Sequence, residues 1–173
     1  ITTDSNGIAQ MDNLPAGKYY VKEVKTAHGY VLDGEPRYVD LSYRDQDTPV
    51  ITYDEKWQNT RQKVKVTVLK KEKDTDRVLA GGVFGLYTSE DIKNVNGDVL
   101  LEKDSLIEQK ATDEKGQITF AADLPVDGKY YVKENSAPDG FVTTEEVQEF
   151  TFEYAGEDQA EVCLLYTSDA ADD

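Results

Sequence analysis

The sequence has very few of the residues that build disulfides, metal centres and catalytic triads. Its 173 residues include one cysteine, Cys163, and one histidine, His28. A single cysteine excludes a disulfide within the chain, and a single histidine argues against a histidine-based metal site or triad. The acidic stretches RDQDT and EKDTD lack the spacing of an EF-hand calcium loop, and turn composition accounts for them. We therefore expect no metal and no cofactor.

Positive charge and long apolar runs are also scarce. The chain carries 19 Lys and Arg against 35 Asp and Glu, which gives a formal net charge of -16. Nucleic-acid binding needs clustered basic residues to contact phosphates, so this balance argues against it. No apolar run approaches the roughly 20 residues of a membrane-spanning helix. We expect no nucleic-acid partner and no membrane insertion of this segment.

Short alternating segments are what the sequence has instead. In VKVTVLK, residues 64–70, Val64, Val66, Val68 and Lys70 fall on one face. Strands are also predicted for VFGLYT, KYYVKE and QEFTFEY, and a hairpin for LIEQKAT and GQITF around the turn DEKG. The excursion DIKNVNGDVLLEKDS predicts a surface loop or an added hairpin, and no long segment has a helical period. This pattern predicts an all-β fold, an antiparallel sandwich.

One motif occurs twice. LPAGKYYVKE begins at Leu14 and LPVDGKYYVKE begins at Leu124. Gly17 corresponds to Gly128 and Glu23 to Glu134, so the offset is 111 residues. A period this long indicates tandem domains of about 110 residues rather than a solenoid.

The last eleven residues, CLLYTSDAADD, are similar to the conceptual translation of a sequencing-library adapter, and a poorly structured natural tail is the alternative. The offset of 111 makes position 170 the equivalent of Asn59, but that position is Ala170, and the similarity of the two copies ends near Cys163. We therefore predict three parts. Residues 1–62 are the back part of one domain, residues 63–162 are a second domain without the end of its last strand, and residues 163–173 are a non-native tail.

Three segments in order carry a family resemblance: LKKEKDTDRVLAGGVFGLY, TDEKGQITFAADLP and GKYYVKENSAPDGF. They resemble the SpaA-type pilin and Cna B-type domains of Gram-positive surface proteins, and the likeness covers essentially all of residues 1–162. The resemblance implies a prealbumin-like sandwich of seven strands with reversed immunoglobulin topology. Such domains form the stalks of adhesins and pilus subunits, and many contain a spontaneous Lys–Asn isopeptide bond that a buried glutamate catalyses.

The resemblance also implies roles for particular residues. The lysine lies on the first strand, the glutamate ends the Y-x-V-x-E strand and the asparagine lies on the last strand. These positions match Lys70 and Glu134 in the second copy and Glu23 and Asn59 in the first. Lys71 is the alternative to Lys70, and an ordinary surface salt bridge is the alternative role for each glutamate. Neither copy has all three residues.

Alternation supports these roles, because it places the glutamate of KYYVKE on the face of its first tyrosine and its valine in both copies. A carboxyl group turned into the core is expected to be held in its neutral form, and a buried lysine amine is expected to lose its proton readily. A neutral amine is a nucleophile, and a protonated carboxyl group can polarise a carboxamide and transfer protons.

The function expected from these features is structural. The chain would be a stalk or spacer module of an extracellular, cell-wall-attached adhesin or pilin-like protein, with neighbouring repeats of the same chain as partners. It would not be an enzyme with turnover, since its only chemistry is a single crosslinking event. One alternative is an adhesin domain that binds a host protein or a glycan through an exposed aromatic patch. Another is an accessory module of a secreted enzyme.

Overall fold

The computed structural model describes residues 1–48 and 50–170, in which eleven strands and no helix are found. The chain divides into two compact units. Unit 1 consists of Ile1–Thr26 and Leu32–Asn59, and unit 2 consists of Ala27–Val31 and the chain from Thr60 onward. That these units are two copies of one domain stays a prediction, as do its boundaries at residues 62 and 162.

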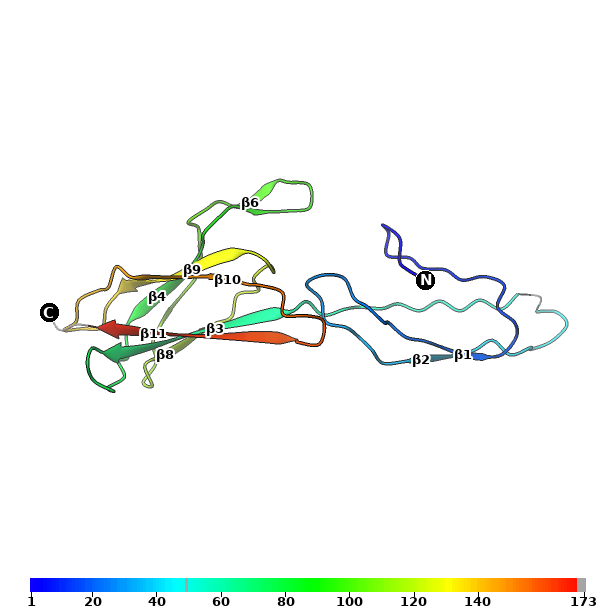
Figure 1. Ribbon diagram of the computed structural model, residues 1–173, viewed down its shortest axis with the longest axis horizontal. Coiled ribbons are helices and arrows are strands. Elements are labelled where there is room, and N and C mark those ends of the chain that lie inside the picture. The colour runs from blue at the N-terminus through cyan, green and yellow to red at the C-terminus, as the bar shows by residue number, and fades with distance from the viewer. Residues whose placement is uncertain (49, 171–173) are drawn as a thin grey trace. The chain divides into compact units, whose positions relative to one another are not determined.

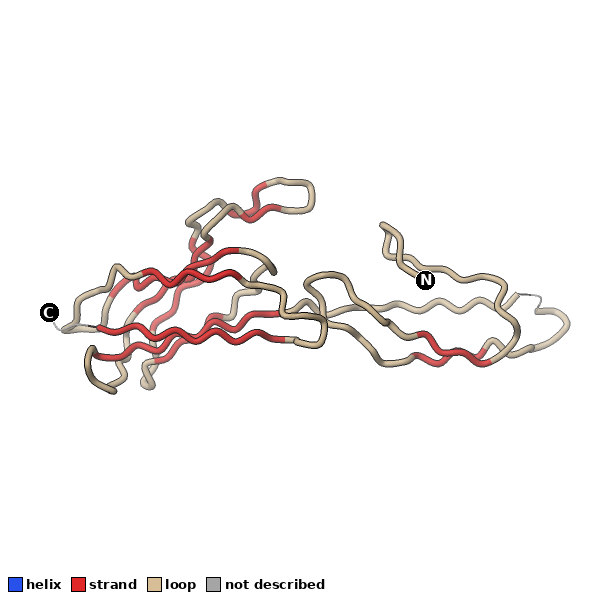
Figure 2. The backbone as a smooth tube through the Cα atoms, in the orientation of Figure 1, coloured by secondary structure: helices blue, strands red, loops and turns tan. Residues whose placement is uncertain are grey.

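The described residues of unit 1 form one small sheet. Strand β1, Lys18–Val21, pairs antiparallel with β2, Arg37–Asp40. Among its described residues Val39 is the one buried hydrophobic side chain, so little apolar surface holds this unit together. Figure 2 shows that most of unit 1 is loop.

Unit 2 is a sandwich whose larger sheet has four antiparallel strands. Its order is β10-β9-β4-β7, with β10 at Val147–Thr151, β9 at Lys129–Ser136, β4 at Val83–Thr88 and β7 at Leu106–Ala111. The tyrosine, valine and glutamate of KYYVKE that were predicted to share a face are all buried in β9.

The smaller sheet has the order β11-β3-β8, with β11 at Glu161–Ala170, β3 at Lys63–Glu72 and β8 at Gln117–Phe120 (Figure 1). Strand β8 is antiparallel to β3, whereas β11 runs parallel to it. This is the one parallel pair among the described strands, and it places the last strand of unit 2 beside its first. In its register Ser168 lies opposite Lys70.

The core of unit 2 lies between these two sheets. Alternation in β3 is confirmed, because Val64, Val66, Val68 and Lys70 are all buried. They pack with apolar side chains from both sheets, among them Phe84, Leu86, Ile118, Phe120, Tyr130 and Val132. A sandwich core built from alternate residues of facing strands is what the sequence predicts.

The predicted hairpin of LIEQKAT and GQITF is wrong. Strand β7 pairs with β4 in the larger sheet, and β8 pairs with β3 in the smaller one. The DEKG turn does form, since the Gly116 N–H donates to the Asp113 carbonyl at 2.8 Å, but it carries the chain from one sheet to the other. Alternation and turn chemistry identify strands and turns, whereas they do not identify which strand each one pairs with.

The excursion after β4 forms an added hairpin. Strand β5, Ile92–Lys93, pairs with β6, Val99–Leu101. The hairpin stands away from the two sheets, as the label β6 in Figure 1 shows.

Strand β11 includes residues 163–170 of the predicted non-native tail. Cys163 is exposed, and Ala170 is buried at the end of the strand. Pairing with β3 does not reveal the origin of these residues, so the adapter interpretation stays a prediction, and residues 171–173 lie outside the described part of the chain.

Candidate functional site: a buried lysine and glutamate

Lys70 and Glu134 meet between the two sheets of unit 2. Lys70 lies near the end of β3 in the smaller sheet, and Glu134 lies in β9 of the larger sheet. The Lys70 Nζ atom is 2.9 Å from Glu134 Oε1, and it donates a hydrogen bond to Oε2 at 3.1 Å. Both side chains have 0% exposure. The structure therefore brings together the two residues that alternation turns inward.

Three further groups surround this pair. Lys70 Nζ donates to the Ser168 hydroxyl at 3.2 Å, and the Phe84 ring centroid lies 5.8 Å from Nζ. The Thr144 N–H donates to Glu134 Oε2 at 2.9 Å. Glu134 Oε1 has the Lys70 amine as its ion-pair neighbour, but among the described groups it accepts no hydrogen bond of good geometry. One carboxylate oxygen thus keeps an acceptor position free inside the core.

The pair can exist in two protonation states. An ammonium and a carboxylate attract each other strongly in a dry interior, but both lose their hydration there. Transfer of one proton from nitrogen to oxygen gives an amine and a carboxylic acid, which avoids burying two charges. The amine then has a free lone pair, and the acid has a proton that it can donate.

Unit 1 has a related arrangement around Glu23. Asn59 Nδ2 donates to Glu23 Oε1 at 2.7 Å and also bonds to the Thr26 hydroxyl. The Asp33 N–H donates to Glu23 Oε2 at 3.0 Å. In both units, therefore, a backbone N–H ten residues after the glutamate donates to Oε2. Glu23 and Asn59 are half-buried, in contrast to the sealed pair of unit 2.

The other candidate lysine lies outside the core. Lys71 is 29% exposed, and its amine contacts Asp76 at 3.3 Å. Trp57 is half-buried under the Arg37 guanidinium, 4.0 Å from the ring centroid. His28 is exposed and contacts Asp127 at 2.7 Å, a partner that the sequence does not indicate.

Sequence reasoning missed Ser168 and Thr144. Ser168 lies in the segment that is predicted to be a non-native tail, and Thr144 contributes a backbone N–H, which the residue type does not indicate. The offset of 111 indicates position 170 as the equivalent of Asn59, but the structure places Ser168 opposite Lys70 and pairs Ala170 with Glu72.

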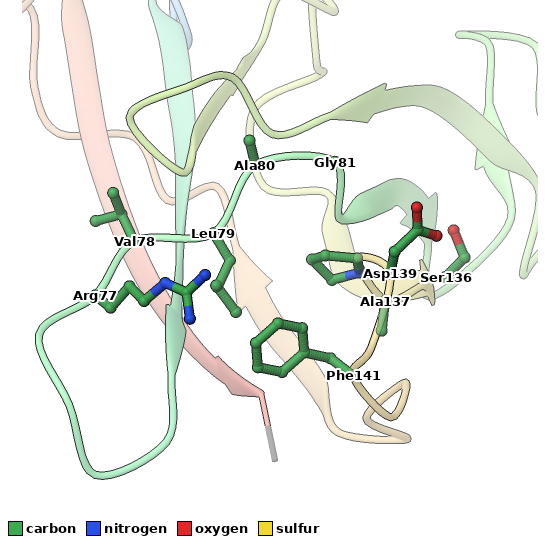
Figure 3. A pocket seen from close by; sticks show the side chains of 10 residues that line it. Arg77, Val78, Leu79, Ala80, Gly81, Ser136, Ala137, Asp139 and Phe141 are labelled. Carbon is green, nitrogen blue, oxygen red and sulfur yellow. The ribbon is translucent and has the colours of Figure 1, made fainter. Parts of the chain in front are cut away.

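A surface pocket lies near this site. Two segments line it, residues 77–81 before β4 and residues 136–141 after β9. Figure 3 shows the Leu79 and Phe141 side chains facing one another, with Arg77 and Asp139 on opposite sides. The lining combines apolar groups with one cation and one carboxylate, and it contains neither Lys70 nor Glu134.

These features define a prealbumin-like sandwich with a buried lysine–glutamate pair between its first strand and the Y-x-V-x-E strand. The family model described as SpaA, prealbumin-like fold domain, matches residues 1–57 and 64–162. The chain belongs to this family, so the expected family and the all-β, prealbumin-like fold are confirmed. Among the described residues no helix could cross a membrane.

Several solved structures are similar to the chain. The Bacillus anthracis TIE protein is 27% identical with a TM-score of 0.70, over 98% of this chain and 28% of that protein. The major pilin SpaD from Corynebacterium diphtheriae is 23% identical with a TM-score of 0.47, over 66% of this chain and 33% of that one. The group B streptococcus pilus 2b backbone protein is 17% identical with a TM-score of 0.47, over 97% of this chain and 54% of that one.

This chain thus spans about a third or less of the first two of these proteins, since it covers 28% and 33% of their lengths. A comparison with curated proteins finds no match.

Proposed function

We propose that the chain is a structural stalk or spacer segment of an extracellular, cell-wall-attached protein of the adhesin or pilin type. We also propose that its domains are of the kind that an isopeptide bond between lysine and asparagine ties together. Family membership supports the structural role. The observation that carries the crosslink is the sealed contact of Lys70 with Glu134, beside the inward-facing Ser168 of the neighbouring last strand.

Ser168 occupies the place where a crosslinking asparagine would react. The carboxamide carbon of asparagine is bonded to Cβ, as the serine oxygen is, so an asparagine at 168 would present that carbon near the position of Oγ. Ser168 Oγ lies 3.2 Å from Lys70 Nζ. Reacting atoms about 3–3.5 Å apart are in the range of a near-attack geometry.

The chemistry is a transamidation. The neutral Lys70 amine attacks the carboxamide carbon while the protonated Glu134 polarises the carboxamide oxygen through a hydrogen bond and keeps its proton at this stage. The new N–C bond forms, the C–NH₂ bond breaks, and Glu134 passes a proton to the departing nitrogen, which leaves as ammonia. Glu134 recovers a proton from the former lysine nitrogen, so atoms and charges balance.

The consequence of such a bond is mechanical. It joins the first and last strands of unit 2, which lie side by side in parallel. On a loop-closure account, a crosslink that closes a loop of about 100 residues stabilises the fold by roughly 4–5 kcal/mol. It would also prevent the terminal strands from being pulled apart.

The test is the intact mass of the Ser168→Asn variant. We expect a loss of about 17 Da, the mass of one ammonia, because the new carboxamide meets the Lys70 amine. The double variants Ser168→Asn/Glu134→Gln and Ser168→Asn/Lys70→Met should keep the full mass, whereas Ser168→Asn/Lys71→Met should lose ammonia.

The Ala170→Asn variant tests the alternative position that the repeat indicates. If Ala170→Asn loses ammonia and Ser168→Asn does not, the crosslink proposal holds but the reacting position is 170 rather than 168. Full mass in folded forms of both asparagine variants would contradict the crosslink and leave a plain structural sandwich.

The competing function, binding of a host protein or glycan, is favoured by one feature of unit 1. Tyr20 and Tyr38 are cross-strand neighbours with 65% and 79% exposure, and their ring centroids are 6.1 Å apart. Exposed aromatic pairs offer stacking surfaces to ligands. Glycan-array and matrix-protein binding that disappears in the Tyr20→Ser/Tyr38→Ser variant would establish this function, and equal binding by that variant would exclude this surface.

A further inference from the structure

A parallel strand pair has no hairpin turn to set its register. Strands β3 and β11 are neighbours in the sheet but lie at opposite ends of the unit 2 sequence. Chain connectivity therefore does not determine which residue of β11 faces Lys70. Alternation does not determine it either, because a shift by two residues leaves every side chain on its original face. The inward positions of β11, which are Val162, Leu164, Tyr166, Ser168 and Ala170, are mostly apolar and would accept such a shift.

Gln62 is a buried polar residue at the beginning of this strand pair. It directly precedes β3 and has 1% exposure. Its side-chain oxygen accepts from the Ala155 N–H at 2.8 Å, and its Nε2 donates to the carbonyls of Gly156 at 3.1 Å and Gln159 at 2.6 Å. The amide therefore uses its acceptor and both its donors on one loop, residues 155–159, which leads from β10 into β11.

We infer that Gln62 is the positioning residue that sets the register of β3 against β11. Its three hydrogen bonds attach the start of β3 to the loop that delivers β11, and the Lys63 N–H adds a bond to the Ala160 carbonyl at 2.9 Å. From this fixed origin the parallel ladder runs to the pair Lys70 and Ser168. A shift of two residues, about 7 Å along the strand, would break all three side-chain bonds at once.

This inference deepens the proposed crosslink, on which its functional meaning rests. Gln62 contacts neither Lys70 nor Glu134, but it decides which residue of the last strand is presented to the amine. A buried amide that did nothing except satisfy polar groups would affect stability without affecting register.

Cys163, a free and exposed cysteine of β11, provides a direct readout of register. It lies opposite Lys65, and both residues are exposed. Neighbouring strands are about 4.8 Å apart, which is within the Cα separation that a disulfide bridges. Lys63 lies opposite Glu161, so its Cα is about 8 Å from that of Cys163, which is too far for a disulfide.

The experiment oxidises the Lys65→Cys and Lys63→Cys variants with oxidised glutathione. Disulfide formation is measured by intact mass as a loss of about 2 Da. With Gln62 present, we expect the bond in Lys65→Cys and none in Lys63→Cys. With Gln62→Ala added, the disulfide yield of Lys65→Cys should fall by more than half, and that of Lys63→Cys should rise. Gln159→Ala is the matched control, because it removes a side chain that bonds only the Glu161 carbonyl and retains the backbone acceptor.

The Gln62→Glu variant repeats the test with a side chain of equal length. It retains an acceptor for Ala155 and loses the two donors to the loop carbonyls. An unchanged preference for Lys65→Cys in both Gln62 variants would overturn the inference. Loss of folding in both variants would overturn it as well, because it would show a role in the whole fold rather than in register.

The disulfide readout does not depend on the isopeptide bond, so the two proposals fail separately. Full mass in Ser168→Asn leaves the register test intact. If the crosslink and the register role of Gln62 both hold, Gln62→Ala in the Ser168→Asn background should slow the loss of ammonia several-fold.

Discussion

At the scale of single residues, the Lys70–Glu134 pair is an ion pair whose two side chains both have 0% exposure. A buried ion pair is a weak source of stability, because desolvation of two charges offsets their attraction. Removing one partner is a different matter, since it leaves the other charge buried and uncompensated. The presence of the pair is therefore weak evidence for a contribution to stability.

A double-mutant cycle on this pair checks that argument. Lys70→Met and Glu134→Leu should each lower the free energy of unfolding by about 3–5 kcal/mol, whereas the double variant should be close to neutral or more stable. Urea unfolding followed by fluorescence measures the free energy of unfolding of the single and the double variants. Lys71→Met is the control and should change the value by less than about 0.5 kcal/mol, because its amine is on the surface. Equal losses of stability in Lys70→Met, Glu134→Leu and the double variant would contradict a buried interaction between Lys70 and Glu134.

Tyr130 makes unit 2 sensitive to alkaline pH. Burial raises the pKa of this tyrosine above its ordinary value of about 10, with a smaller contribution from Glu90. The folded state then holds its proton where the unfolded chain releases it. The contribution of Tyr130 to the free energy of unfolding is therefore fully present below about pH 10, and it falls as the pH rises further.

Urea unfolding between pH 9 and pH 11 tests this dependence. In Tyr130→Phe the loss of stability above about pH 10 should become shallower by up to about 1.4 kcal/mol per pH unit. At neutral pH the variant should have a lower free energy of unfolding than the wild type, because it lacks the hydrogen bond from the Tyr130 hydroxyl to the Pro125 carbonyl at 2.9 Å. Parallel profiles of variant and wild type would count against the argument.

The sequence predicted those site residues that strand parity determines. The inward direction of Lys70 and Glu134 follows from alternation, because the direction of a side chain from a strand is a local property. Ser168, the Thr144 N–H and the amide of Gln62 depend on which strands and loops become neighbours. Such contacts have no local signal, and Gln62 stands in the polar stretch WQNTRQK, where composition indicates only a linker.

At the scale of elements, the DEKG turn shows how a local signal and a tertiary contact coincide. Gly116 has a φ of +69°, and a Cβ placed there would lie 2.7 Å from the Lys70 carbonyl oxygen and 2.8 Å from Val78 Cβ. The turn thus packs directly against β3 at the lysine. Turn composition predicts a turn at DEKG, but it does not predict that this turn joins two sheets.

Substitution of Gly116 separates backbone strain from packing. Gly116→Ala should lower the free energy of unfolding by about 2–5 kcal/mol, which combines left-handed strain with displacement of β3. Gly97→Ala in the β5–β6 hairpin is the matched control, since φ is +88° there and nothing lies within 4 Å. It should cost about 1–2 kcal/mol, the strain alone. Equal losses in urea unfolding would show that the tight contact at Gly116 is absent.

Strand pairing is the part of the fold that periodicity left open. The segments that contain β3, β4, β9 and β10 are predicted to be strands, and a strand is found in each. Parallel and antiparallel neighbours require the same alternation, however, so neither the parallel β3–β11 pair nor the separation of β7 from β8 could be read from it. Pairing is set by how the whole chain closes its core.

At the scale of the whole molecule, the two units differ in how much they bury. Nearly all buried hydrophobic residues belong to unit 2, whereas Val39 alone represents unit 1 among the described residues. Local stability follows buried apolar contacts and protected hydrogen bonds. Unit 1 should therefore open much more often than unit 2.

Hydrogen exchange followed by mass spectrometry measures this difference. Amides of β1 and β2 in unit 1 should exchange early, and those of β3, β4 and β9 in unit 2 should exchange last, near the global unfolding rate. Brief trypsin digestion should cut first at Lys22, Lys25 and Arg44, which are exposed. The β5–β6 hairpin serves as an internal reference for fast exchange within unit 2. Protection of β1 and β2 equal to that of β4 would show that unit 1 gains its stability from something other than the apolar surface it buries.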